Sequence, residues 1–159
     1  MIRTRGGWKN FVCLVLMGWA ALFAQGFNDV AEAKVPTVTI GDGNIVKLEV
    51  AASEAEIERG LMGRTSLPED QGMVFLFHPA RPVEFWMFHC FIPLDMVFVK
   101  DGKIVKIIAN VPPCTSPNPR ECPRYSPGNV DISEVIELSA GYAERHKVKE
   151  GDPVKFNLP

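Results

Sequence analysis

The chain has 159 residues, of which 47% are apolar and 23% are charged, and its formal net charge is −2. This length and composition fit one globular domain and exclude a polytopic membrane protein, a disordered chain and a collagen-like repeat. With 17 basic and 19 acidic residues, the chain lacks the broad basic surface that binds nucleic acid, so we expect no nucleic-acid partner.

The first 33 residues are typical of a secretory signal peptide. Basic residues near the start precede a charge-free apolar run over 11–24, and Ala31-Glu32-Ala33 is a small-x-small cleavage pattern. The run is shorter than the roughly 20 residues that span a membrane. We therefore expect an exported protein, periplasmic or extracellular, with no membrane span after cleavage. An uncleaved N-terminal anchor and an earlier cut at Ala24-Gln25-Gly26 are the alternatives.

The first elements of the remaining domain, 34–159, are predicted from alternation and capping. Residues 34–51 form two strands around a glycine-rich turn. Ser53 followed by Glu56 is a capping box, which predicts a helix that stops near Gly63 and carries Arg64 on the face of its apolar residues. Two further strands are predicted over 73–77 and 83–91, separated by a turn with two prolines.

The clearest predicted element is a hairpin over 94–109 around an Asp101-Gly102 turn. This turn pairs residue 98 with 105, 96 with 107 and 94 with 109. One face of the hairpin is then wholly apolar and the other nearly so. A sheet that is apolar on both faces predicts a barrel, or a sheet partly covered by helix and loop.

The C-terminal part is predicted to contain a proline-rich loop over 112–127, a strand over 132–138, a short helix over 140–146 and a closing strand over 152–157. Together these elements predict a single α+β domain over 34–159. It is mainly antiparallel β and barrel-like, with two short helices.

Several ordered strings of this chain resemble the bacterial and archaeal family named Domain of Unknown Function 192, over about residues 45–157. The resemblance implies a compact, largely β domain and brings no activity. After Trp86-Met87 the family typically has a lysine, an asparagine and often a threonine; this chain has Phe88, His89 and Cys90 there. The strings are RGLMGR at 59–64, GMVF at 72–75, FWM at 85–87, IPLDM at 92–96, VPPC at 111–114, CPRY at 122–125 and GD at 151–152.

Cys114 and Cys122 bracket the proline-rich loop, and in an exported protein we expect them to form a disulfide. Cys90 is then a free thiol, or it pairs with one of the other two. His89 beside it suggests a Cys–His dyad, but neighbours on a strand point to opposite faces. A redox or metal site built from the three cysteines is an alternative. Its spacing is not that of a usual zinc site, so we predict no metal and no cofactor.

Asp95 lies inside an apolar predicted strand, where a charge has to be paired or solvated. Lys106, diagonally across the hairpin, is one candidate partner. Arg64 is the other, because a guanidinium can bind a carboxylate through two hydrogen bonds. An Asp95–Arg64 pair would lie at the floor of a pocket.

Trp86 and Tyr125 combine an aromatic ring with a polar group. If the proline-rich loop folds over the segment carrying Trp86, an aromatic-lined cleft for a small ligand results. We therefore predict a non-catalytic envelope module that binds a small ligand or a partner protein through Arg64, Trp86, Asp95 and Tyr125. A cleft enzyme using Cys90 or a carboxylate (Asp95 or Glu84) is the alternative, and the oligomeric state is left open.

Overall fold

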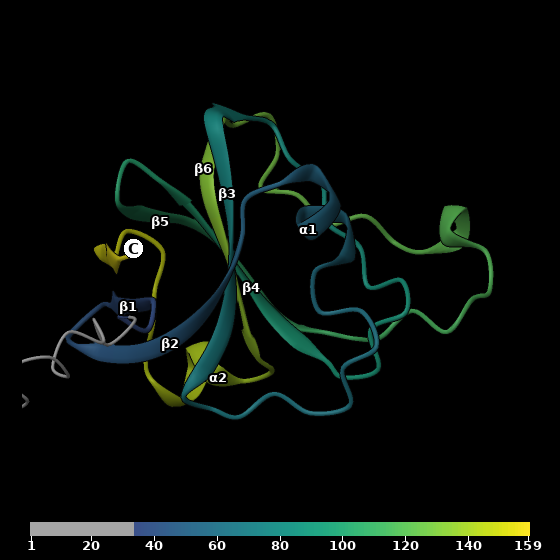
Figure 1. Cartoon of the computed structure of the whole chain (residues 1–159), viewed down its shortest axis with the longest axis horizontal. Helices are drawn as coiled ribbons and strands as arrows, with labels where there is room; N and C mark the ends of the chain where they lie inside the picture. The colour runs from purple at the N-terminus through teal and green to yellow at the C-terminus, as the bar shows by residue number, and fades with distance from the viewer. Residues whose placement is uncertain (1–33) are drawn as a thin grey trace, which may run out of the picture. The chain divides into compact units, whose positions relative to one another are not determined.

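The structure is a computed structural model that describes residues 34–159 (Figure 1). The predicted signal peptide, 1–33, lies outside the described residues. Among the residues described, no helix is long and apolar enough to cross a membrane. The elements are β1 (Thr37–Ile40), β2 (Asn44–Ala51), α1 (Glu54–Arg59), β3 (Gln71–Arg81), β4 (Leu94–Lys100), β5 (Lys103–Val111), a 3₁₀ turn η1 (Pro119–Glu121), β6 (Ile132–Ser139), α2 (Tyr142–Arg145) and β7 (Val154–Asn157).

All seven strands join one curled sheet in the order β5-β4-β6-β3-β2-β1-β7. Neighbouring strands are antiparallel except β2 and β3, which are parallel and are connected through α1. The two outer strands meet at one end. There Ile104 N–H donates to Asp152 O at 3.0 Å, and Val154 N–H donates to Gly102 O at 2.8 Å. The predicted fold class, a mainly antiparallel, barrel-like α+β domain with two short helices, is confirmed.

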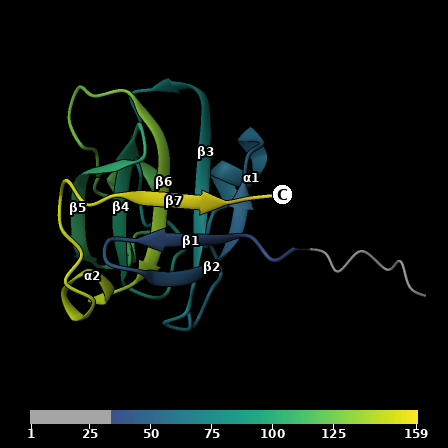
Figure 2. The same cartoon turned by 90° about the vertical axis from the view of Figure 1, so that its left-hand side faces the viewer.

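Both faces of the sheet are covered. Figure 2 shows β1 and β7 running across β3, β4 and β6, and one core lies where these strands and α2 pack together. The second core lies on the opposite face, under α1 and the connections that follow β3 and β5. The first core includes Val38, Val97, Ile136, Leu138 and Tyr142; the second includes Phe75, Phe85, Met87, Met96 and Phe98.

The register of the predicted hairpin is correct beside its turn and wrong farther out. Val99 faces Ile104 as the Asp101-Gly102 turn requires, but Phe98 faces Lys106 and Leu94 faces Val111. Two irregularities in β5 cause the difference, because each extra residue shifts all later pairs by one. As a result, Val105, Ile108 and Val111 pack into the core that contains Phe98.

The strand predicted over 83–91 is wrong. This segment has only isolated bridges, from Phe85 to Tyr125 and from Phe88 to Cys114, and His89 has a positive φ of 56°. The segment is a loop that covers the core, and it buries Phe85 and Met87 there without forming a strand. The predicted helix also ends early, at Arg59 rather than near Gly63, so Arg64 lies on the loop after α1.

Candidate functional site

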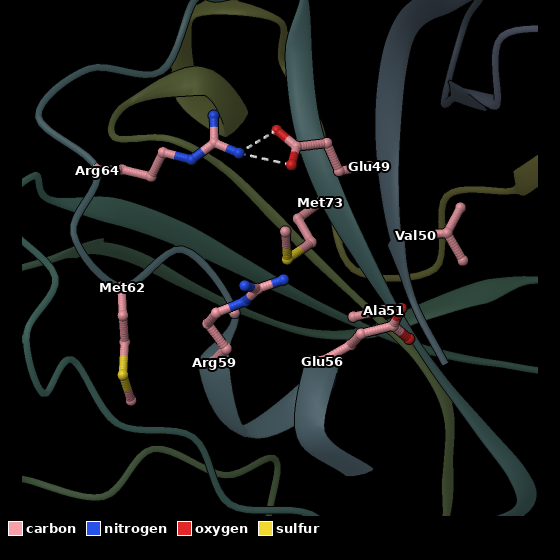
Figure 3. A pocket seen from close by; sticks show the side chains of 9 residues that line it. Glu49, Val50, Ala51, Glu56, Arg59, Met62, Arg64 and Met73 are labelled. Carbon is pink, nitrogen blue, oxygen red and sulfur yellow. Dashed lines mark hydrogen bonds and ion pairs between the residues drawn. The ribbon is translucent and has the colours of Figure 1, made fainter. Parts of the chain in front are cut away.

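A surface cavity of about 350 Å³, here called the outer cavity, lies between the end of α1, the loop that follows it, and strands β2 and β3 (Figure 3). Its volume is within the range of small-ligand sites. Polar and charged groups line it together with methionine and small apolar side chains. The lining residues are Glu49, Val50, Ala51, Glu56, Arg59, Gly60, Met62, Arg64 and Met73.

Helix α1 is held in place by its two ends. At its start the Ser53 hydroxyl accepts from Glu56 N–H at 3.3 Å, and the Glu56 carboxylate accepts from Ser53 N–H at 2.9 Å. At its end Gly60 has a positive φ of 43°, and a Cβ there would lie 3.2 Å from the Phe75 ring. Glycine therefore lets the helix end press against the core, which fixes the direction of Arg59.

The charges of the outer cavity are unequally satisfied. The Arg64 guanidinium donates to both carboxylate oxygens of Glu49, at 2.6 and 2.5 Å, and Glu56 is occupied by the helix cap. Arg59 has no ion-pair partner among the residues described. Figure 3 shows its guanidinium beside Met73 in the middle of the cavity. The Glu56 carboxylate is close enough to interact with Arg59 electrostatically, but Arg59 is the one guanidinium lining this cavity that an anion can reach without breaking an ion pair among the residues described.

A second cavity of about 30 Å³, here called the inner cavity, shares Arg59, Gly60 and Met62 with the outer one. Aromatic side chains form much of its wall, and it has room for one small chemical group. Cys90 and Glu137 are the buried thiol and the buried carboxyl that line it. The other lining residues are Ile57, Glu58, Leu61, Phe75, Phe85, Trp86 and Phe88.

Glu137 is the chemically unusual group of this region. Its residue is only 3% exposed, and no hydrogen bond or ion pair of its carboxyl is present among the residues described. Burial without a partner raises the pKa of the Glu137 carboxyl to about 8, because the charged form loses its hydration. At neutral pH this carboxyl is mostly protonated.

Cys90 is a buried free thiol, and it does not form a dyad with His89. Burial, and secondarily the nearby Glu137 carboxyl, raise the pKa of the Cys90 thiol to about 12. The exposed His89 ring instead stacks on Phe88, with 3.8 Å between ring centroids. A thiol in this state is almost wholly protonated and is a poor nucleophile.

The predicted partners of Asp95 are wrong. Its fully buried carboxylate accepts three backbone N–H groups, from Asn110 at 2.8 Å, Gly141 at 3.0 Å and Ala143 at 2.9 Å. Lys106 pairs with Glu150 instead, and Arg64 pairs with Glu49. The carboxylate thus joins the ends of β4 and β5 to the turn before α2.

The four residues of the predicted ligand site divide among different places. Arg64 lines the outer cavity and Trp86 the inner one, whereas Asp95 and Tyr125 line neither. The proline-rich loop does fold onto the segment carrying Trp86. Tyr125 and Phe85 exchange backbone hydrogen bonds at 2.8 and 2.9 Å, and the Arg124 guanidinium lies 4.1 Å from the Trp86 ring centroid.

The other predicted chemical groups are also located. Cys114 and Cys122 form the expected disulfide, so neither is a thiolate that could join Cys90 in a metal site. Glu84 is exposed, away from both cavities. Within residues 34–159, no three side chains of the His, Cys, Asp and Glu types are grouped as metal ligands.

Sequence reasoning missed Glu137. The signal that could have found it is the same one that singled out Asp95, namely an acidic residue within an apolar run, here Val135-Ile136-Glu137-Leu138. Arg59 is visible in the sequence, but the fact that it forms no ion pair depends on where the helix ends and on the pairing of Arg64 with Glu49.

Residues 37–156 of this chain match the model of the DUF192 family, which is described as uncharacterised. The chain therefore belongs to that family. No curated protein sequence matches it.

Two solved structures are similar in fold and sequence. One is a protein of unknown function from Novosphingobium aromaticivorans, with 31% identity and a TM-score of 0.69, covering 82% of this chain and 91% of that one. The other, from Sinorhizobium meliloti, has a proposed role as a transcription regulator. It shares 31% identity with a TM-score of 0.68, covering 78% of this chain and 95% of that one.

Proposed function

We propose that this chain is an exported, non-catalytic module that binds a small ligand in the outer cavity, through an anionic group of the ligand held by Arg59. The observation that carries the proposal is the guanidinium of Arg59, which points into a ligand-sized cavity and forms no ion pair with a carboxylate among the residues described. A carboxylate or phosphate oxygen is the group that this donor accepts best.

The neighbouring charges support the choice of Arg59 over Arg64 as the ligand's contact. Arg64 is already paired with Glu49, and displacing that carboxylate would cost part of the binding free energy. The Arg64–Glu49 pair instead closes one side of the cavity, as seen in Figure 3. Arg64 and Trp86 thus stay within the proposed site, while Asp95 and Tyr125 support the fold around it.

The chemistry of the described residues favours binding over catalysis. Cys90 holds its proton at physiological pH, and the nearby Glu137 carboxyl is itself mostly protonated at neutral pH and forms no hydrogen bond with the thiol. The ionised carboxylates at the outer cavity, Glu49 and Glu56, are held by an arginine and by a helix cap. Within residues 34–159, therefore, we find no nucleophile hydrogen-bonded to a general base in the way that covalent catalysis requires.

Export is supported by the predicted signal peptide and by the Cys114–Cys122 disulfide, since disulfides persist mainly outside the cytoplasm. A module of this kind would meet its small ligand, or a partner protein carrying the same anionic group, in the cell envelope.

Isothermal titration calorimetry tests the proposal with acetate, butyrate, succinate, 4-aminobutyrate and inorganic phosphate as probes. We expect at least one of these oxyanions to bind the full chain. Arg59→Gln should then weaken that probe about tenfold to a hundredfold, as loss of a charge-assisted hydrogen bond does. Comparison of the carboxylate probes with inorganic phosphate shows which of the two anionic groups the site binds.

Arg120→Gln is the matched control, because Arg120 is an exposed arginine in η1, outside both cavities. It should leave the affinity unchanged. Equal weakening by both substitutions would mean that binding reflects general positive charge. An unchanged affinity in Arg59→Gln, or no binding of any probe, would overturn the proposal.

A further inference from the structure

Glu137 occupies a special position in the sheet. It lies on β6, directly opposite Met73 of β3 on one side and Met96 of β4 on the other. Every fully enclosed side-chain oxygen or nitrogen in the described part of the chain has a hydrogen-bond partner. Since the Glu137 carboxyl has none, its oxygens retain access to the inner cavity that it lines. The carboxyl is therefore buried, unpartnered and open to one small space.

The wall of this space is aromatic. Phe75 and Phe85 pack edge to face with ring centroids 4.9 Å apart, and Trp86 lies 5.7 Å from Phe88. A carboxylate among aromatic rings is complementary to a cation, because ring faces and carboxylate oxygens both carry negative potential. The inner cavity has room for one small group, so a primary ammonium fits and a larger cation does not.

The other charged or titratable groups that line the inner cavity are Glu58, Arg59 and Cys90. The Glu58 carboxylate carries a negative charge, which attracts a cation. The Arg59 guanidinium is turned toward the outer cavity, beside Met73 (Figure 3). Cys90 and Glu137 alone supply too few ligands for a typical protein metal site. The surroundings of Glu137 therefore favour an organic ammonium group.

The two cavities are related through one residue pair. Met73 lines the outer cavity and Glu137 lines the inner one, and they are direct cross-strand neighbours. Residues opposite each other on antiparallel strands have their Cβ atoms about 5 Å apart. The cation of Arg59 and the carboxyl of Glu137 thus lie on either side of Met73.

We propose that Glu137 is the ammonium-binding group of this cleft, and that the ligand is a small zwitterion of the amino-acid class whose carboxylate lies at Arg59. This inference rests on the proposed anion site and adds the chemical class of the ligand. The ammonium group would bind the ionised form of Glu137, so binding displaces the proton that the carboxyl holds in the empty protein.

Calorimetry on the full chain tests the inference with glycine, β-alanine, 4-aminobutyrate and 5-aminopentanoate, which differ only in the distance between ammonium and carboxylate. Their N-acetyl derivatives keep the carboxylate and lack the positive charge. We expect one length to bind best, and its N-acetyl derivative to bind at least tenfold more weakly. This comparison uses unaltered protein, so it does not depend on whether a variant folds.

The pH dependence gives a second readout. With a carboxyl pKa of about 8, affinity for the best zwitterion should fall roughly twentyfold from pH 8.5 to pH 6.5, because the binding-competent ionised fraction falls by that factor. Glu137→Gln should bind the zwitterion no better than the N-acetyl derivative and should lose this pH dependence.

The outcomes separate this inference from the proposed function. If N-acetyl derivatives bind as tightly as free zwitterions and Arg59→Gln still weakens both, Glu137 is not an ammonium site and the anion site stands. If Arg59→Gln changes the affinity for neither the zwitterions nor their N-acetyl derivatives, the proposed function fails as well. Unchanged zwitterion binding by a folded Glu137→Gln variant would also overturn the inference.

Discussion

Asp95 and Glu137 are two buried carboxyl groups with opposite surroundings. Asp95 accepts three backbone N–H groups, whereas Glu137 accepts none from the residues described. A carboxyl group that accepts several backbone N–H groups satisfies those donors and holds the surrounding backbone together. Asp95 is therefore a structural residue, and Glu137 is available to a ligand.

We predict that Asp95→Ala lowers the free energy of unfolding by about 3 kcal/mol or more, because it leaves buried N–H donors without acceptors. Asp95→Asn keeps one carbonyl oxygen and should cost less. Urea unfolding measures both. Asp70→Ala, which removes an exposed carboxylate paired with Lys47, is the control and should have little effect. A fully stable Asp95→Ala variant would contradict this role.

Cys90 should be chemically inert in the folded protein. With the pKa of its thiol at about 12, only a very small fraction is thiolate at pH 8, and the thiol is also buried. We expect iodoacetamide to modify Cys90 readily in urea but hardly at all in the native protein, as read by peptide mass mapping. Rapid modification in the native state would instead support the cleft-enzyme alternative.

The residue types of the site were partly predictable, and their pairing was not. The sequence indicates that Asp95 needs partners, but the partners are backbone groups of β5 and of the start of α2, which residue type cannot reveal. Arg64 was identified as a site residue through an expected pair with Asp95. It lines the outer cavity through a pair with Glu49 of β2, because α1 ends early.

At the scale of elements, strands with period-two alternation and clear turns were predictable. The strands around 41–44, the Asp101-Gly102 hairpin and the strand over 132–138 are all present. The segment 83–91 was not predictable from composition, because aromatic residues that cover a core as a loop have the same composition as a strand. A capping box defines where α1 begins, whereas two glycines, Gly60 and Gly63, compete to end it.

The disulfide is an element-scale constraint on the proline-rich loop. It closes the segment from Cys114 to Cys122, and Cys114 N–H also donates to Met87 O at 3.1 Å. We predict that Cys114→Ser with Cys122→Ser lowers the free energy of unfolding by about 2.5 kcal/mol, from the chain entropy of the opened loop. Reduction of the unaltered protein should give the same loss in urea unfolding. If neither change has an effect, the loop is held by its other contacts.

At the scale of the whole domain, Glu137 makes stability depend on pH. Its pKa is about 8 in the folded state and near 4.5 when exposed, so between these values the folded state holds one proton more than the unfolded state. Stability from this group is therefore complete below pH 4.5 and is lost as pH rises to about 8.

We predict that the unfolding free energy of Glu137→Gln, minus that of the unaltered protein, increases by about 4 kcal/mol between pH 5 and pH 8.5. Subtracting the two proteins cancels the titration of all other groups. Urea unfolding at several pH values measures the difference. A difference that does not change with pH would show that Glu137 ionises normally and is paired or hydrated.

The strand order of the domain lies beyond sequence pattern alone. Alternation predicts that strands exist and that both faces are covered, and this is confirmed. It does not predict that β2 and β3 are parallel, nor that β6 inserts between β3 and β4. Those choices depend on contacts between residues far apart in the chain. They also place Glu137 beside Met73.

The pairing of β1 with β7 has a consequence for how the chain matures. The first strand of the domain has the last strand as one of its two neighbours, with Thr37 opposite Asn157 and Ile40 opposite Val154. During synthesis from the N-terminus, β1 can find β2 early, but its outer edge stays unpaired until the final residues emerge. A nascent chain shorter than about 154 residues cannot complete its sheet, so the domain can fold fully only when nearly the whole chain has been synthesised.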